Sequence, residues 1–236
     1  HVGRLTPELA AEVLRDRSTH PWPNASNVGN LFVLNAAIVH PASRTLWHAT
    51  TMQPLAPFGA YEGFSLGADA SPPGLPPSPL LGSGDEKRQR ASIERTRRAL
   101  HAALEERPAE AAWLLEDVLA EVPPVLDPTR IALGLGWAKL GAGDAQGAFD
   151  VLAVATGAEA DDDVRIDGFS MRALAADRLG RRQDAVSLHA AALALVDAHP
   201  EWNVYGPTRA LAQRGLREAL PDEKPVTSPY AIRVPF

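Results

Sequence analysis

The hydrophobic pattern of the N-terminal part predicts a short helix followed by a strand hairpin. Thr6 is a favourable N-cap for a helix that runs to about Arg17 with one apolar face. The stretch 31–39 is apolar and partly β-branched, and 45–51 is a second short strand candidate. Residues 40–44 between them carry the proline and small polar residues of a hairpin loop.

The first of these strands is apolar on both faces, which is typical of a central strand in a covered sheet. A two-stranded hairpin is only marginally stable by itself in water. The pattern offers few other strands, so we expect the rest of the sheet to lie upstream or on another chain.

The composition changes after the hairpin. Residues 52–84 are rich in Pro, Gly and Ser, which predicts an irregular segment wrapped on a surface rather than regular structure. Within this segment we expect Phe58, Tyr61 and Phe64 to anchor the chain on a neighbouring domain. The predicted domains are a first segment at 1–66, a linker at 67–84 and a helical domain at 85–236.

Apolar periodicity, punctuating prolines and short connections predict antiparallel helices from Asp85 onward. Alanine is frequent at the inward positions, which allows neighbouring helices to approach closely. The predicted fold class is therefore mostly α with a small β hairpin. The predicted helices lie near 86–106, 109–121, 128–141, 144–156, 166–179, 183–198 and 208–219.

Two of the predicted helix pairs are similar to each other. Gly143 and Gly180 lie 37 residues apart, and each is followed five residues later by an alanine, Ala148 or Ala185. This pattern resembles the tetratricopeptide repeat, a helix–turn–helix unit of about 34 residues with small residues where the helices touch. The resemblance implies an antiparallel helical-repeat domain, in which each pair buries its apolar face against the next pair.

Composition and charge narrow the function classes. Apolar residues make up 45% of the 236 residues, which is enough for a core and excludes a wholly disordered chain. The net charge of −6 argues against a dedicated nucleic-acid binder, and we expect no membrane span. Cysteine is absent, so the chain holds no disulfide, no thiolate zinc site and no cysteine nucleophile. The first residue is His1 rather than Met, so we expect a processed chain or a fragment; the cellular compartment stays open.

The N-terminal segment carries a set of short motifs that together point to a known family. The motifs are 5–7 (LTP), 14–17 (LRDR), 32–41 (FVLNAAIVHP) and 43–49 (SRTLWHA). They resemble the C-terminal end of the acyl-CoA:6-aminopenicillanic acid acyltransferase family. Proteins of that family are N-terminal-nucleophile enzymes related to the choloylglycine hydrolases.

This resemblance implies the C-terminal strands of an αββα sandwich whose larger part lies outside this chain. In the family, self-cleavage exposes a cysteine whose α-amine acts as the base for attack on an amide or thioester. The nucleophile would then lie on a second chain, together with the rest of the sheet. Where the family commonly has a Ser/Cys/Arg cluster, this chain has Asn24, Ser26 and Asn27, which at most supply polar contacts to a substrate or an oxyanion.

Other patterns that suggest ligands have simpler structural interpretations, so we expect no metal and no cofactor. The histidines near the hairpin (His20, His40 and His48) lack the convergent partners of a metal site. The acidic run 161–163 lacks the donor pattern of a calcium loop, and it suits a helix N-terminus instead. The glycines between 134 and 141 lie inside a helical pattern, which predicts close helix packing rather than a nucleotide loop.

Basic and aromatic residues of the helical part also favour structural roles. The basic residues between 87 and 98 predict a solvated helix face, with docking to an acidic surface of a missing domain as the alternative. Nucleic acid is less favoured still, because aromatic platforms are absent there. Trp113, Trp137 and Trp202 are expected to pack in the core or between repeats.

Two function hypotheses from different classes follow. The first is the C-terminal portion of an N-terminal-nucleophile amidohydrolase or acyltransferase with a helical-repeat extension, inactive as a single chain. The second is a non-catalytic tetratricopeptide-like scaffold that binds a peptide or protein on its concave face. A third interpretation is that the helices only stabilise the sheet.

Overall fold

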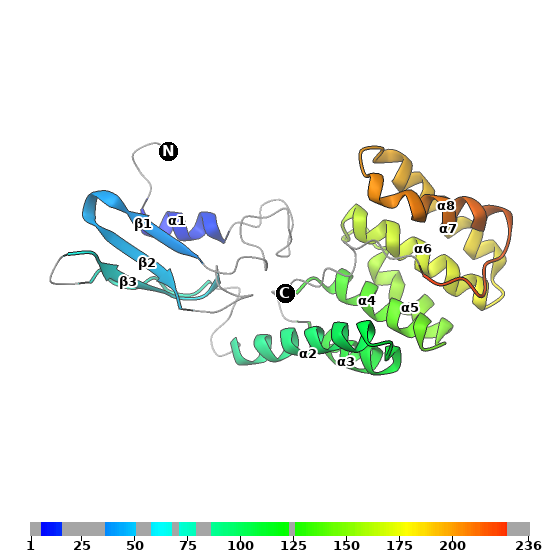
Figure 1. Ribbon diagram of the computed structural model, residues 1–236, viewed down its shortest axis with the longest axis horizontal. Helices are drawn as coiled ribbons and strands as arrows, with labels where there is room; N and C mark the ends of the chain where they lie inside the picture. Colours follow the sequence, from blue (N-terminus) through cyan, green and yellow to red (C-terminus); the bar gives the residue numbers. More distant parts are fainter. Residues whose placement is uncertain are drawn as a thin grey trace. The chain divides into compact units, whose positions relative to one another are not determined.

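The computed structural model describes residues 6–15, 36–50, 58–67, 71–78, 86–122 and 126–225 (Figure 1). The chain is mostly helical with a small antiparallel sheet, as predicted. It divides into two compact units. The sheet unit takes in the described residues up to Ile93 together with Leu126 and Asp127, and the helical unit takes in the rest from Glu94 onward. None of the described helices combines the length and the apolar character needed to cross a bilayer.

The sheet has three antiparallel strands in the order β1-β2-β3. The predicted hairpin is confirmed, with a short 3₁₀ turn between its strands and Arg44 in the left-handed conformation at φ 52°. The third strand corrects the prediction of irregular structure throughout 52–84. Residues 31–35 of the first predicted strand lie outside the described residues. The strands are β1 (Ala37–His40), β2 (Thr45–Ala49) and β3 (Tyr61–Ser65).

One face of the sheet is covered by helix α1 (Pro7–Leu14), which the side chain of Thr6 caps as predicted. Ala11 of the helix packs with Ile38 and Trp47 of the sheet, and the Trp47 indole N–H donates to the carbonyl of Pro73 at 3.0 Å. Tyr61 belongs to the same core. The expectation that Tyr61 anchors the chain on a neighbouring domain is therefore corrected, because its ring completes the core of its own unit.

The opposite face of the sheet is open and carries one apolar row beside the polar pair His48 and Glu62. Val39, Leu46 and Phe64 are register partners on successive strands and form a row across this face. Val39 is 60% exposed and Phe64 is 40% exposed. Strand β1 thus presents apolar side chains on both faces, but among the described strands it lies at the edge of the sheet rather than at the predicted central position.

The helical unit is built from consecutive helices whose bounds agree with the predicted ones to within a turn. The main difference is at α6, which begins at Asp162 rather than near 166 because the acidic residues 161–163 suit a helix N-terminus. The helices are α2 (Glu86–Leu104), α3 (Pro108–Ala120), α4 (Pro128–Gly141), α5 (Ala145–Ala155), α6 (Asp162–Arg178), α7 (Arg182–Ala198) and α8 (Gly206–Arg217).

These helices pack in two layers. From α3 onward, each helix packs against the next in the chain, and α6 also packs against both α4 and α8. Helices α4, α6 and α8 therefore form one layer, here called the inner layer, with α5 and α7 behind it (Figure 1). The core between α4, α5 and α6 includes Leu140, Leu152 and Met171, all buried.

Glycines lie at turns and at a close contact between helices of this stack, as the sequence predicts. Gly143 and Gly180 join successive helices at positive φ, 86° and 73°, which favours glycine. Gly136 lies where α4 touches α5, since a Cβ there would lie 2.4 Å from the Leu152 side chain. The prediction of close packing around Gly136 is confirmed.

The tryptophans of the helical unit differ in how far they are exposed. Trp137 packs against the core of α4, α5 and α6, and Trp202 stacks on His199 with ring centroids 3.9 Å apart. Trp113 is 65% exposed, so the prediction that it packs inside the protein is wrong. It lies on the solvent side of α3, whose buried face is formed by other residues, including Leu114 and Leu115.

Two glycine substitutions on α4 test the contact between α4 and α5. At 134 a Cβ would meet Leu115 at 3.5 Å, which is an ordinary contact, whereas at 136 it would overlap Leu152. We expect Gly136→Ala to lower the free energy of unfolding by about 1–3 kcal/mol through overpacking. Gly134→Ala should raise it by about 0.5–1 kcal/mol through helix propensity. Urea unfolding measures both, and equal effects would contradict the described packing.

Candidate functional site

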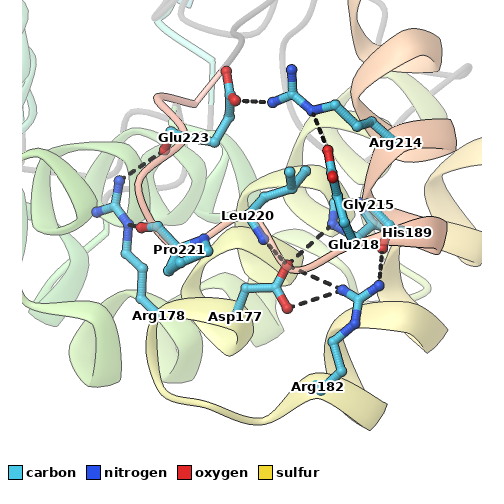
Figure 2. A network of polar contacts seen from close by, with 10 residues as sticks. All are labelled: Asp177, Arg178, Arg182, His189, Arg214, Gly215, Glu218, Leu220, Pro221 and Glu223. Carbon is cyan, nitrogen blue, oxygen red and sulfur yellow. Dashed lines mark hydrogen bonds and ion pairs between the residues drawn. The ribbon is translucent and has the colours of Figure 1, made fainter.

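The helix pair α6 and α7 has a buried polar cluster at the positions where the preceding pair, α4 and α5, has apolar core residues. Leu140 of α4 and Leu152 of α5 are buried in the first pair. The residues 37 positions later are Asp177 of α6 and His189 of α7, and both side chains are fully buried. With Arg182 of α7 they form what we call the polar cluster (Figure 2).

The carboxylate of Asp177 is the centre of this cluster. Arg182 Nη1 donates to its two oxygens at 3.1 and 3.3 Å, and the backbone N–H of Leu220 donates to Oδ2 at 2.9 Å. His189 Nε2 lies 3.9 Å from the same oxygen. Arg182 also donates to the backbone carbonyl of Gly215 on α8. The cluster therefore joins α6, α7, α8 and the segment that follows α8.

His189 is held by shape rather than by hydrogen bonds. Among the described residues, neither of its ring nitrogens has a hydrogen-bond partner. Its ring lies against Gly215, where a Cβ would come within 2.2 Å of Nε2, so only glycine leaves room for it. Burial lowers the pKa of His189, the charge of Asp177 opposes this shift, and Arg182 adds to it. The ring is therefore neutral at neutral pH.

The segment after α8, residues 218–225, folds back across the inner layer, and we call it the strap. Its Leu220 side chain is buried with Leu174 of α6 and Leu211 of α8. Arg178 of α6 donates through Nε to the carbonyl of Pro221 and through Nη2 to that of Glu223, both at 3.0 Å. Figure 2 shows the strap running past these side chains.

Two further contacts tie the strap to the inner layer. Arg178 Nη1 donates to the carbonyl of Leu140 at the end of α4, at 2.7 Å, so one guanidinium joins α4, α6 and the strap. Arg214 of α8 pairs with the carboxylate of Glu223. Each arginine thus holds a group of the strap that extended peptides also offer, either a main-chain carbonyl or an acidic side chain.

This arrangement suits recognition better than catalysis. A catalytic acid–base pair must reach a substrate, whereas Asp177 and His189 are enclosed by three helices and the strap. In contrast, the buried carboxylate accepts a main-chain N–H of the strap, and the neighbouring guanidinium donates to main-chain carbonyls of the strap. The described contacts therefore hold the backbone of a segment of the same chain.

The residues singled out from the sequence lie elsewhere. Asn24, Ser26, Asn27 and His20 all lie outside the described residues. His40 pairs with the hydroxyl of Ser43 in the hairpin turn, which fits its structural interpretation.

The acidic run 161–163 is paired with cations of the protein. Arg130 bridges Asp161 and Asp163 at 3.2 and 3.0 Å, while Asp162 bonds Arg165 at 2.8 Å and His199 at 3.0 Å. The bond to Asp162 raises the pKa of His199 above its ordinary value. Within the described ranges, no group of three or more acidic or histidine side chains is placed to hold a metal ion.

Sequence reasoning missed the polar cluster and the strap. The signal that could have found the cluster is the 37-residue spacing, which aligns Asp177 with Leu140 and His189 with Leu152. A polar residue at a position that is apolar in the neighbouring repeat indicates a buried polar interaction. No comparable signal marks the strap.

Replacing His189 with the leucine of the neighbouring repeat tests the burial of its ring. In the wild type the pKa of His189 is lower when folded than when unfolded, so the unfolded state binds the proton more readily. Stability is therefore lost as the pH falls below about 6.5. We expect His189→Leu to raise the free energy of unfolding by about 1–2 kcal/mol at neutral pH, because two unpaired nitrogens are removed.

Urea unfolding between about pH 5 and pH 8 measures this effect, and the substitution should flatten the acid side of the profile. His101→Leu, at an exposed position of α2, is the control and should leave the profile unchanged. A less stable His189→Leu protein with an unchanged pH profile would contradict the described environment.

Comparison with known proteins was made at three levels. Neither the family models, nor the curated proteins, nor the solved structures contain a match to this chain.

Proposed function

We propose that the helical unit is a protein-interaction module of the tetratricopeptide type that binds peptide segments on its inner layer. The observation that carries this proposal is the strap, which lies on α6 and is held through main-chain groups by Asp177 and Arg178. A surface that holds a segment of its own chain through main-chain groups has the chemistry to hold one from a partner.

The packing of the helices supports the same proposal. Stacked helix pairs bury their apolar faces against their neighbours and leave a long surface along one layer. The equivalent alanines Ala148 and Ala185 are both fully buried where helices meet, as a repeated unit requires. Gly143 and Gly180 have the same role in the two pairs.

Selection from a phage-displayed library of random peptides tests this function. The bait is the full chain carrying Leu220→Ser, which weakens the strap and exposes the inner layer. We expect enriched peptides to bind with dissociation constants of about 10 μM or tighter, as measured by fluorescence anisotropy. Adding Arg178→Ala to the bait should weaken binding at least about tenfold, because charge-assisted bonds to the peptide carbonyls are lost.

The matched control is Arg165→Ala in the same bait, since Arg165 also lies on α6 but pairs with Asp162 away from the strap. It should leave the affinity unchanged. Failure to enrich any peptide, or equal losses from both arginine substitutions, would reject a peptide-binding role for the inner layer. Circular dichroism confirms that each variant keeps its helices.

The sheet unit supports a second candidate function. We propose that it is the C-terminal segment of an N-terminal-nucleophile amidohydrolase or acyltransferase, with the nucleophile on a second chain. The supporting observation is an antiparallel sheet with a helix on one face and an open apolar row (Val39, Leu46 and Phe64) on the other. In an αββα sandwich each sheet is covered by helices outside and by the other sheet inside. Asn24, Ser26 and Asn27 would then offer polar contacts near the substrate.

The open row allows a direct test of this second function. We expect the tagged chain, purified from its source cells, to carry a polypeptide whose N-terminal residue is Cys, Ser or Thr. Val39→Asp should abolish that association, because it places a charge in the apolar contact. Val13→Asp, at another exposed valine of the sheet unit, should preserve it.

N-terminal sequencing and intact mass identify the associated polypeptide. An association that survives Val39→Asp, or a partner with a different N-terminal residue, would contradict this assignment. The result does not depend on the peptide selection, because the two tests address different units of the chain.

A further inference from the structure

The strap contacts the inner layer as a bound peptide does. The N–H of Leu220 and the carbonyls of Pro221 and Glu223 all bond to side chains of α6. These are groups that every peptide carries, and here they lie in a turn, in which the Glu223 N–H donates to the Leu220 carbonyl at 3.3 Å. Main-chain hydrogen bonds determine where a peptide lies on α6, while the side chains of the peptide determine which sequences bind.

Two strap side chains provide that selectivity. Leu220 is 6% exposed and fills the apolar contact with Leu174 and Leu211. Three residues later, the carboxylate of Glu223 pairs with Arg214. Pro221 between them has no N–H to satisfy, and its fixed φ suits the second position of the turn. The recognised pattern is therefore Leu-Pro-x-Glu, an apolar residue followed by an acidic one.

The rest of the strap is loosely held. Glu218, Ala219, Pro221 and Asp222 are exposed, so Leu220 is the one large apolar side chain that the strap buries among its described residues. Helix α8 keeps its own contacts with α6 and α7 whether or not the strap is in place. Segments with few buried apolar contacts open at lower free energy than the core that they cover.

Opening of the strap removes hydrogen-bond partners from side chains of α6, and another peptide can replace those partners. When Leu220 leaves, Asp177 keeps its bonds to Arg182 but loses its backbone N–H donor. Arg178 likewise loses two carbonyl acceptors. Asp177 is buried and Arg178 is half-buried, so a replacement that offers the same groups at the same spacing is favoured most strongly at the carboxylate.

We propose that the strap is a self-ligand: residues 218–225 occupy in cis the site at which the inner layer binds a partner's peptide that forms a turn at a Leu-Pro-x-Glu sequence. The partner is an acidic segment with a leucine three residues before a glutamate, and it competes with the strap. The strap thereby limits binding to partners that are abundant or tethered nearby. This inference rests on the peptide-binding function proposed above.

A peptide copied from the strap tests the competition directly. The probe is a fluorescein-labelled peptide of residues 218–225, EALPDEKP, titrated against the full-length protein. We expect Leu220→Ser in the protein to strengthen binding of this probe at least about tenfold, because the competing strap is weakened. Asp222→Ser changes an exposed strap residue and should leave the affinity as in the wild type. A probe with serine in place of its leucine should not bind either protein.

A second measurement uses the wild type and does not depend on a folded variant. Saturating unlabelled probe should accelerate hydrogen exchange in the protein's own strap, since a displaced strap loses the bond from its Leu220 N–H. Exchange in α3, far along the stack, should not change.

The outcomes separate this inference from the function on which it rests. Equal affinity of the probe for wild type and Leu220→Ser, or an unchanged strap exchange at saturation, overturns the self-ligand. If the probe fails to bind while library peptides bind and depend on Arg178, the self-ligand is overturned and the peptide-binding function stands. If neither binds, both fail.

Discussion

The buried carboxylate of Asp177 is the constraint on which the C-terminal part of the helical unit depends. It is fully enclosed, so its charge is tolerable only because Arg182 and the N–H of Leu220 bond to it. Removing Arg182 leaves the buried charge without its cation, whereas opening of the strap removes one neutral donor and leaves the Arg182 bonds in place. Asp177 therefore links α6, α7 and the strap through one side chain. The first helix pair needs no such link, because its interface at Leu140 and Leu152 is apolar.

The two helix pairs differ in how much their interfaces specify about a neighbouring segment. An apolar interface is non-directional and specifies little beyond volume. A buried carboxylate and an arginine that donates to carbonyls specify the position and direction of a main chain. Stacked repeats also need a terminal element to cover the last exposed face. Helix α8 covers that face by packing on α6 and α7, while the strap lies on α6 and α8 and indicates what kind of segment fits the inner layer.

The sequence predicts the elements whose signals are local. Prolines and glycines such as Pro128 and Gly143 mark where helices begin and end, and these bounds agree with the structure. Strand β3 was missed because it forms by pairing with β2, which lies earlier in the chain. Gly63 lies against the carbonyl of Pro72, and the many prolines nearby indicate a linker instead. Likewise, the sequence shows that Asp177 is polar but not that Leu220, 43 residues later, buries it.

Native-state hydrogen exchange of the Leu220 N–H tests the central claim, that the strap opens while the helices stay folded. The account predicts that this amide exchanges through local opening, at a free energy below that of the buried α6 amides and independent of urea at low concentration. Exchange of Leu220 only through global unfolding, with the urea dependence of the Met171 amide in the core, would show that the strap cannot be separated from the fold and would contradict the account.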